Sequence, residues 1–337
     1  MASQGSNVAL VADNQPALNE CALSKPEPAP NQVLVKISHV AQNPTDVQSF
    51  DSKTFGEGAV YGCDFVGKAV QLGSEVTRVE EGDVIAGEVP GIGAYSHFTL
   101  ADEKICFKPP SNITPSEAVT VPLAATTAWL ALYSKQCLNM NRNNPQSVLI
   151  WGGSSSVGQY AIQLAALYSF DVITTCSSKN FELVKKLGAK HVFDYKSEDV
   201  IDRIKEVAPD LTFIFDTIGS TTSSGTASKA VTGRGRLCTV RPGKANTENL
   251  ANNVKVTDVL VWTAFLKDHS YGKFHWPASM DDHLLAAELY EKLPEWLESG
   301  KVKPNAVLAM KGLDSVSRGF ELHRQGKVSG QKIIYEI

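Results

Sequence analysis

The sequence predicts an α/β protein built around a doubly wound parallel sheet. From Gln146 onward, strand-like apolar runs alternate with helix-like runs, a pattern typical of parallel sheets covered by helices on both faces. A glycine- and serine-rich turn, residues 152–158, follows the first of these strands and opens a helix. The chain has 337 residues, of which 43% are hydrophobic and 20% charged, so it is long enough for two domains.

The region from Gln32 to about Phe107 is predicted to be all-β. Its short alternating or β-branched runs are separated by Gly, Pro and Asp pairs, and they cover residues 33–38, 65–72, 83–86 and 95–100. Many short strands with tight turns favour a compact barrel over an open sheet.

A change of composition near Pro109 and Pro110 marks a boundary. Thr114-Pro115-Ser116-Glu117 is a helix start signal, and 118–132 reads as one long apolar helix. The alternating block then predicts strands at 147–151, 171–176, 191–193, 211–216 and 235–240, and helices at 157–168, 181–187, 199–207 and 224–231. Helices at 281–299 and 314–325 and a closing strand at 331–335 follow. We expect this end to join the β-rich start in one domain.

Composition excludes several functional classes. With 32 basic and 36 acidic residues, a net charge of −4 gives no nucleic-acid footprint. The six cysteines are widely spaced, which fits a reducing, cytoplasmic location better than a disulfide framework. The sequence has no secretory layout and no apolar run long enough for a membrane span, so no membrane partner is expected.

The turn after Val148–Trp151 is the candidate dinucleotide site. Gly153 and Gly158 fit the first and last glycines of a G-x-G-x-x-G motif, and Ser155 replaces the middle one. We expect the backbone at Gly153, Ser154, Ser155, Ser156, Val157 and Gly158 to approach a pyrophosphate at the helix N-terminus. The alternative is an ordinary tight turn between strand and helix.

The end of the next strand favours NADPH over NADH. Strand 171–176 is followed by Ser177-Ser178-Lys179-Asn180, without the acidic residue that binds the ribose 2′-hydroxyl of NAD. Hydroxyls and an ammonium suit a dianionic 2′-phosphate. The alternative is that Ser177 and Lys179 only begin a solvent-exposed helix.

Several stretches together resemble the medium-chain dehydrogenase/reductase superfamily over essentially the whole chain. These stretches are 43–46, 151–158, 176–180, 193–195, 216–219 and 326–330. The resemblance is to the zinc-independent quinone oxidoreductases and enoyl reductases, and most of all to the fungal trans-acting enoyl reductases that serve polyketide synthases. It implies a GroES-like β-barrel catalytic domain (1–122 and 270–337), a Rossmann NADPH-binding domain (123–269) and an active site in the cleft.

The resemblance also implies residue roles. Ser177, Lys179, Asn180 and Tyr195 would hold the 2′-phosphate and adenosine ribose. Ile218 and Gly219 would pass over the nicotinamide ribose. Asn43 would belong to the cofactor site, and Thr127 would lie at a helix N-terminus near the nicotinamide. These positions are the candidate cofactor and catalytic residues.

No metal is expected. Asn43 stands where the family's alcohol dehydrogenases have a catalytic cysteine, and Gly62-Cys63-Asp64 stands in place of their Gly-His-Glu. The four-cysteine structural lobe is missing as well, so three zinc ligands cannot be assembled from this set.

Without a metal, the predicted chemistry is NADPH-dependent reduction of an activated C=C bond. Hydride adds to the β-carbon, and the resulting enolate must be stabilised and protonated. The relatives are expected to carry a lysine soon after the Asn-Pro-x-Asp loop, but this chain has Gln48, which is neutral and cannot serve as an acid. The candidate catalytic residues are Thr127, Tyr61 and Gln48, with Lys53, Tyr95 or solvent as further proton sources.

Trp262, Phe265 and Phe274 belong to an aromatic cluster that either lines the substrate pocket or packs between the domains. The expected substrate is a small-molecule enoyl group, such as a polyketide enoyl thioester on an acyl carrier protein. The expected partner is that carrier protein or its synthase. The alternatives are a stand-alone quinone or enone reductase and a cofactor-binding member without redox activity.

Overall fold

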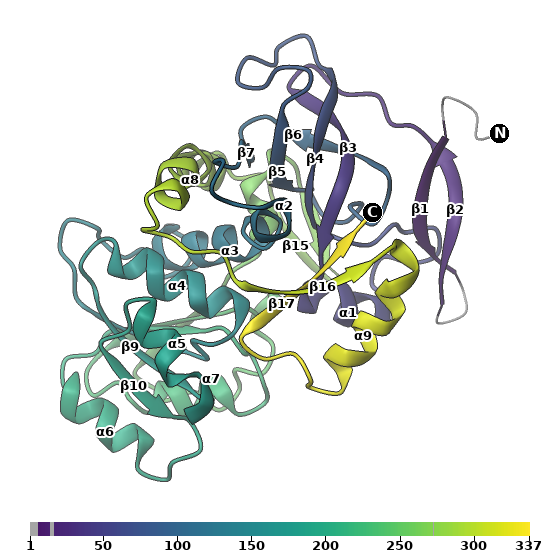
Figure 1. The fold of residues 1–337 in the computed structure, drawn as a ribbon. Helices are drawn as coiled ribbons and strands as arrows, with labels where there is room; N and C mark the ends of the chain where they lie inside the picture. The colour runs from purple at the N-terminus through teal and green to yellow at the C-terminus, as the bar shows by residue number, and fades with distance from the viewer. Residues whose placement is uncertain (1–5, 14–16, 272) are drawn as a thin grey trace.

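The structure is a computed structural model that describes residues 6–13, 17–271 and 273–337. Figure 1 shows two sheets in separate halves of the molecule, and the first and last strands, β1 and β17, both lie in the half that contains the mixed sheet. Outside these sheets are two hairpins, β1 with β2 and β14 with β15, whose bounds are Ser6–Ala12, Leu18–Ser24, His269–Tyr271 and Phe274–Trp276.

The mixed sheet has seven strands in the order β16-β17-β3-β4-β5-β7, with β6 also paired to β3. Their bounds are β3 Gln32–Ala41, β4 Asp64–Leu72, β5 Val84–Glu88, β6 Phe98–Asp102, β7 Cys106–Phe107, β16 Ala306–Lys311 and β17 Gln331–Glu336. Ile334 of β17 pairs with Ala41 of β3, so the two ends of the chain share this sheet. The expected boundaries at 122/123 and 269/270 stay predictions.

The second sheet is entirely parallel, as the alternating pattern predicts. Its order is β10-β9-β8-β11-β12-β13, with bounds β8 Ser147–Trp151, β9 Asp171–Cys176, β10 His191–Asp194, β11 Phe213–Asp216, β12 Gly235–Thr239 and β13 Val254–Asp258. The strand order reverses between β8 and β11, where doubly wound sheets open a crevice at their carboxyl ends. The sequence analysis did not identify β13.

The helices of the parallel half are α4 Ser156–Ala166, α5 Phe181–Lys186, α6 Val200–Val207 and α7 Ser223–Ser228, with a short 3₁₀ turn η1 at Ser178–Asn180. The other helical segments are α1 Pro44–Asp51, α8 Met280–Glu298, α9 Val316–Arg324, η2 Pro242–Lys244, η3 Val261–Ala264 and η4 Leu313–Ser315. The predicted helices 157–168, 181–187, 199–207 and 281–299 correspond to α4, α5, α6 and α8, and the predicted helix 314–325 covers α9 and overlaps η4. Helix α7 ends three residues before the end of the predicted helix 224–231, and α1, η2 and η3 were not predicted.

The long apolar run does not form the single helix that was predicted from Ala118 to Leu132. It forms two, α2 Pro115–Ala118 and α3 Pro122–Tyr133. Pro122 lacks an N–H and clashes with the preceding turn, so it begins a new helix instead of continuing the first. The break matters for the site because it gives α3, which is buried along its whole length, an N-terminal turn of its own, whose first backbone N–H groups lack partners within the helix.

Candidate active site

A cavity of about 350 Å³ lies where the carboxyl ends of the parallel strands face α1. Residues that follow four strands of the parallel sheet form one wall, and α1 and α3 form the other. The lining is mainly apolar and includes Thr45, Gln48, Thr127, Ile218, Arg241 and Trp262. A mostly apolar hollow with a few polar groups is the usual form of a small-molecule site.

A second cavity of about 270 Å³ adjoins the first. Asn43, Pro44, Ser155, Ile218 and His323 line both cavities. The second cavity is bounded further by Ser154 and Ser156 of the glycine-rich turn and by residues 328–333 near the chain end. The two together form one route from the glycine-rich turn to the apolar hollow.

The glycine-rich turn is held tightly against the sheet. A Cβ on Gly153 would lie 2.1 Å from Thr174 Oγ1, and one on Gly158 would lie 2.4 Å from the carbonyl oxygen of Gly152. Ser155 is the N-cap of α4, and its hydroxyl accepts a hydrogen bond from the Gly158 N–H at 2.9 Å. The missing middle glycine is therefore replaced by a residue that caps the helix.

The predicted phosphate-binding residues gather at the tips of β9 and β10. The parallel register pairs Cys176 with Asp194, so Ser177 and Tyr195, the next residue of each strand, leave the sheet side by side. Lys179 is exposed, and Tyr195 is 45% exposed. Asn180 is buried instead, and it donates a hydrogen bond to Ser329 Oγ at 3.2 Å.

The loop after β11 is fixed by a buried carboxylate. Asp216 Oδ1 accepts hydrogen bonds from the backbone N–H groups of Ile218 and Gly219 at 3.0 and 3.1 Å. Asp216 Oδ2 accepts from the hydroxyls of Ser223 and Ser224, both at 2.6 Å. The loop therefore holds Ile218 over the turn, where this side chain lines both cavities.

Two of the three candidate catalytic residues line the apolar cavity. Thr127 lies in the second turn of α3 and not, as the resemblance implied, at the helix N-terminus, because α3 begins at Pro122; its hydroxyl donates to the carbonyl of Leu123 at 2.7 Å. Gln48 lies on α1, and its Oε1 accepts a hydrogen bond from Arg241 Nη1 at 2.7 Å. Tyr61 is buried, and its hydroxyl donates to the Ser49 carbonyl at 3.3 Å.

Tyr61 is not among the described residues that line either cavity. The same is true of the two further proton-source candidates, Lys53 and Tyr95. Lys53 is an exposed residue, whereas Tyr95 is fully buried, and burial raises the pKa of its hydroxyl well above the usual value.

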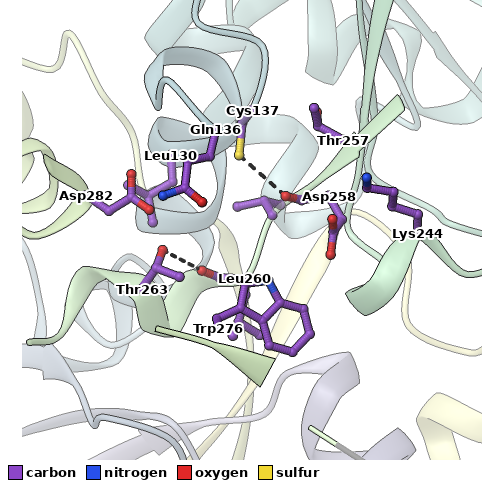
Figure 2. A pocket seen from close by; sticks show the side chains of 11 residues that line it. Leu130, Gln136, Cys137, Lys244, Thr257, Asp258, Leu260, Thr263, Trp276 and Asp282 are labelled. Carbon is purple, nitrogen blue, oxygen red and sulfur yellow. Dashed lines mark hydrogen bonds between the residues drawn. The ribbon is translucent and has the colours of Figure 1, made fainter. Parts of the chain in front are cut away.

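The structure separates the three candidate substrate residues. Trp262 lines the apolar cavity. Phe265 is buried in the core. The Phe274 ring lies against Gly243, where an added Cβ would come within 2.2 Å of it. Trp276, from the same sequence cluster, faces a third cavity of about 200 Å³, which Figure 2 shows with Cys137 and Asp258 around it.

Sequence reasoning missed several residues that shape the site. Arg241 and His323 line the apolar cavity, and Lys332 lines the adjoining one. Arg241 could have been found, because residues just after parallel strands commonly face ligands. His323 could not have been found in this way. It lies on α9, far along the chain from the other residues that line the apolar cavity, and only the folded structure brings it there. The pKa of His323 is lowered from its usual value, mainly because the side chain is partly buried.

Asp64 joins both halves of the molecule beneath the cavities. Its Oδ1 accepts from the backbone N–H of Leu123 at 2.7 Å, in the first turn of α3. Its Oδ2 accepts from Asn43 Nδ2 at 2.8 Å and from Lys332 Nζ at 2.7 Å. This buried carboxylate therefore positions residues of both cavity walls.

The neighbouring Asp46 lies in the same buried layer. Burial raises its pKa to about 7, although hydrogen bonds from Asn43, Cys63 and Tyr95 oppose the rise. The Cys63 thiol donates to the Asp46 carboxyl at 3.4 Å, and burial raises the pKa of this thiol well above its usual value. In the part of the chain that the structure describes, no group of three or more His, Cys, Asp or Glu side chains could hold a metal ion.

No helix within the described ranges has the length and apolar character needed to cross a bilayer.

The crevice at the strand-order reversal and the tight glycine turn define a dinucleotide-binding domain, and the mixed sheet completes a second domain beside it. Residues 29–111 match the family described as the alcohol dehydrogenase GroES-like domain, and residues 156–274 match the zinc-binding dehydrogenase family. The chain belongs to the medium-chain dehydrogenase/reductases, a family of oxidoreductases that bind a nicotinamide cofactor. The GroES-like and Rossmann domains predicted by the resemblance are confirmed.

Curated relatives match almost the whole chain. A zinc-type alcohol dehydrogenase-like protein of Schizosaccharomyces pombe is 32% identical, and the match covers 98% of this chain and 99% of the relative. A trans-enoyl reductase of Pyricularia oryzae is 30% identical over 93% of this chain and 92% of its own. The solved structure of an alcohol dehydrogenase superfamily protein from Novosphingobium aromaticivorans shares the fold, with a TM-score of 0.79 at 23% identity over 98% and 99% of the two chains.

Proposed function

We propose that this protein uses NADPH to reduce the activated C=C bond of an enoyl thioester, carried by the acyl carrier protein of a polyketide synthase. The observation that carries the proposal is a pair of adjoining cavities with five lining residues in common, one at the glycine-rich turn and one mainly apolar with few polar groups. The likeness to a trans-enoyl reductase of Pyricularia oryzae supports the same reaction. When bound, NADPH supplies the hydride for this reduction.

The residues around the turn fit a dinucleotide. The first N–H groups of α4 lack partners within their own helix; Ser155 Oγ accepts from that of Gly158, and the others would be available to a pyrophosphate bound at the turn. A side chain at Gly153 would collide with Thr174 of β9, and one at Gly158 would collide with the backbone of the turn itself. Ser177, Lys179 and Tyr195 supply two hydroxyls and one ammonium at the neighbouring strand tips, a donor set that suits a 2′-phosphate.

The donor groups near the cavity do not fit a zinc ion. Asp64 is engaged by a lysine ammonium, a backbone N–H and the Asn43 amide, and Asn43 is itself a poor zinc ligand. The Cys63 thiol is held in its protonated form by burial, which raises its pKa. We therefore propose a reaction without metal and expect dialysis against a chelator to leave the activity unchanged.

Within this site, the chain has two tasks: to exclude water while orienting the acyl chain, and to offer a hydrogen-bond donor to the substrate carbonyl. The apolar walls from Trp262 and residues 259–261 exclude water and orient the acyl chain, and the Thr127 hydroxyl, which donates a hydrogen bond to the Leu123 carbonyl, lines the same cavity. The carbonyl oxygen of the substrate gains negative charge as hydride arrives, so it needs a donor.

The direct test compares substrates under matched conditions. Purified protein is mixed with NADPH and either crotonyl or longer enoyl thioesters, with 1,2-naphthoquinone in parallel, and NADPH oxidation and the saturated product are measured. We expect turnover of the enoyl thioesters, faster when they are attached to a carrier protein. Turnover of the quinone alone would instead establish a stand-alone quinone reductase. NADPH binding without oxidation by either substrate would indicate a member without redox activity.

The cofactor assignment has its own test. Lys179→Glu replaces a cation at the strand tip by an anion, so it should repel the 2′-phosphate. Because Lys179 is exposed, we expect a moderate loss of about tenfold to 100-fold in the ratio of kcat/KM for NADPH to that for NADH. Lys229→Glu makes the same charge change at another exposed site of the Rossmann domain and should leave the ratio unchanged. An unchanged ratio in Lys179→Glu would refute the phosphate-binding role.

A further inference from the structure

Arg241 enters the apolar cavity from the loop after β12. Its Nε donates to the carbonyl of Gly219 at 2.7 Å, and its Nη1 donates to Gln48 Oε1 at 2.7 Å. Its aliphatic stem covers Gly219, where an added Cβ would lie 2.5 Å from Arg241 Cγ. The Gly219 carbonyl also accepts from Asn246 Nδ2 at 2.9 Å. The guanidinium is therefore fixed from both domains, because α1 carries Gln48.

Both of these acceptors are neutral oxygens. Among the described residues that line this cavity, Arg241 is the only one with a permanent charge, and none is a carboxylate. A guanidinium has five N–H donors, and the two contacts above use two of them. A cation with spare donors in a mainly apolar hollow favours a ligand atom that carries negative charge.

We infer that Arg241 stabilises the oxyanion of the reduction, and that Gln48 positions it across the cleft; this inference rests on the proposed function. As hydride from the reduced nicotinamide bonds to the β-carbon, the π pair of the C=C bond forms a new π bond between the α-carbon and the carbonyl carbon, and the carbonyl π pair moves onto the oxygen. The carbonyl oxygen then takes the negative charge, beside the Arg241 N–H groups. A proton from water next adds to the α-carbon, and the carbonyl bond forms again.

Arginine suits the oxyanion role and not the acid role. A guanidinium is not deprotonated in proteins, so it stays charged throughout the reaction and does not supply the proton. The role also explains why a neutral residue occupies position 48. The Gln48 oxygen accepts from Arg241 without cancelling its charge, whereas a carboxylate there would neutralise it.

The first experiment separates kcat from KM for an enoyl thioester. Arg241→Met should lower kcat by about 100-fold or more, with a smaller effect on KM, because the contact strengthens only as charge develops. Arg241→Lys should retain part of the rate, since it keeps the charge but not the planar fork. Arg236→Met is the matched control: Arg236 lies on β12, the strand that precedes Arg241, and its Nη1 donates to the backbone carbonyl of Leu138 at 3.0 Å, so this variant should keep the wild-type kcat.

The positioning role of Gln48 needs variants of its own. Gln48→Met removes the acceptor and should lower kcat more than it raises KM. Gln48→Glu keeps an acceptor at the guanidinium but cancels its charge, so it should lower kcat further than Gln48→Met does. Equal kcat values for Gln48→Glu and the wild type would overturn the electrostatic role.

A spectroscopic measurement tests the inference without turnover. An acetoacetyl thioester has an ionisable α-carbon, and its enolate absorbs in the ultraviolet. Wild-type protein with oxidised cofactor should increase the enolate absorption of bound acetoacetyl-N-acetylcysteamine, whereas Arg241→Met should not. Cofactor affinity, followed by fluorescence titration, should be the same in both proteins.

The outcomes distinguish the two proposals. If wild-type protein reduces no enoyl thioester, the proposed function fails. If wild-type protein is active and Arg241→Met matches it in kcat and in enolate absorption, only the role of Arg241 fails. A change confined to KM or to cofactor affinity would also overturn the oxyanion role, because it would assign Arg241 to binding in the ground state.

Discussion

Replacing Lys332 by methionine should destabilise the fold by about 3–5 kcal/mol, because it leaves the Asp64 carboxylate buried without a cation. The ammonium lies 2.7 Å from Asp64 Oδ2, and the two side chains are 2% and 0% exposed. The carboxylate keeps hydrogen bonds from Asn43 and the Leu123 backbone, but both donors are neutral. A loss of this size is a large part of the total stability of about 5–15 kcal/mol typical of folded proteins.

The double variant Asp64→Asn/Lys332→Met leaves no buried charge at this place. The amide oxygen can still accept from the Leu123 N–H, so the first turn of α3 keeps its cap. We therefore expect the double variant to be more stable than Lys332→Met alone. The coupling energy between the two sites should be about 2 kcal/mol, as for contacting groups in one network.

Urea unfolding, followed by tryptophan fluorescence and far-ultraviolet circular dichroism, measures these differences from the transition midpoint at constant m. Lys135→Met is the matched control. It breaks a pair of similar length, 2.9 Å to Asp281, whose side chains are 73% and 64% exposed, and it should reduce stability by less than about 1 kcal/mol. The reasoning is refuted if Lys332→Met is no more harmful than the control, or if the effects at Asp64 and Lys332 simply add.

Two other predictions concern the glycine-rich turn and the buried acid layer. Gly153→Ala would force a Cβ to 2.1 Å from Thr174 Oγ1, so it should weaken cofactor binding and lower the melting temperature by several degrees. Gly233→Ala is the control: a Cβ there would lie in open space, so this variant should change neither property. Titration calorimetry and thermal melts check this, and equal results for the two variants would contradict it. The pKa of Asp46 is raised to about 7 from an ordinary 3.8, so between these pH values the folded state keeps a proton that the unfolded state loses. The free energy of unfolding therefore falls as the pH rises through this range, by on the order of 4 kcal/mol. Wild type should therefore exceed Asp46→Asn in stability by more at about pH 5 than at about pH 8, and a difference that does not vary with pH would argue against the burial of this carboxyl.

The parallel sheet was predictable because its elements have strong periodic patterns. The predicted strand 171–176 matches β9 in full, and the predicted strand 147–151 matches β8. The break at Pro122 was missed because the apolar run conceals it, although proline at the first position of a helix is common. Strand β13 was missed because Val254–Asp258 lies at the sheet edge and is only partly buried, so its pattern is weak.

The cavity was harder to predict than the fold. The candidates at the glycine-rich turn follow from local sequence, since a strand, a turn and a helix are neighbours along the chain. The contact between Gln48 and Arg241 joins residues that are 193 positions apart, and no local pattern reports it. Tyr61 was a candidate because a tyrosine hydroxyl can donate a proton. In the structure this hydroxyl donates to the Ser49 carbonyl of α1, a contact that residue type alone does not reveal.

The contact between Gln48 and Arg241 also gives a physical reason why this chain lacks the lysine that the resemblance to trans-acting enoyl reductases leads us to expect at position 48. A lysine ammonium at that place would lie next to the Arg241 guanidinium, and two cations in an apolar cavity repel each other strongly. The cation of this site therefore comes from the Rossmann domain, and α1 of the GroES-like domain supplies a neutral acceptor. If Arg241 has the role inferred above, the guanidinium is held by Gly219 of its own domain and by Gln48 of α1, so the rate of reduction should depend on the relative position of the two domains.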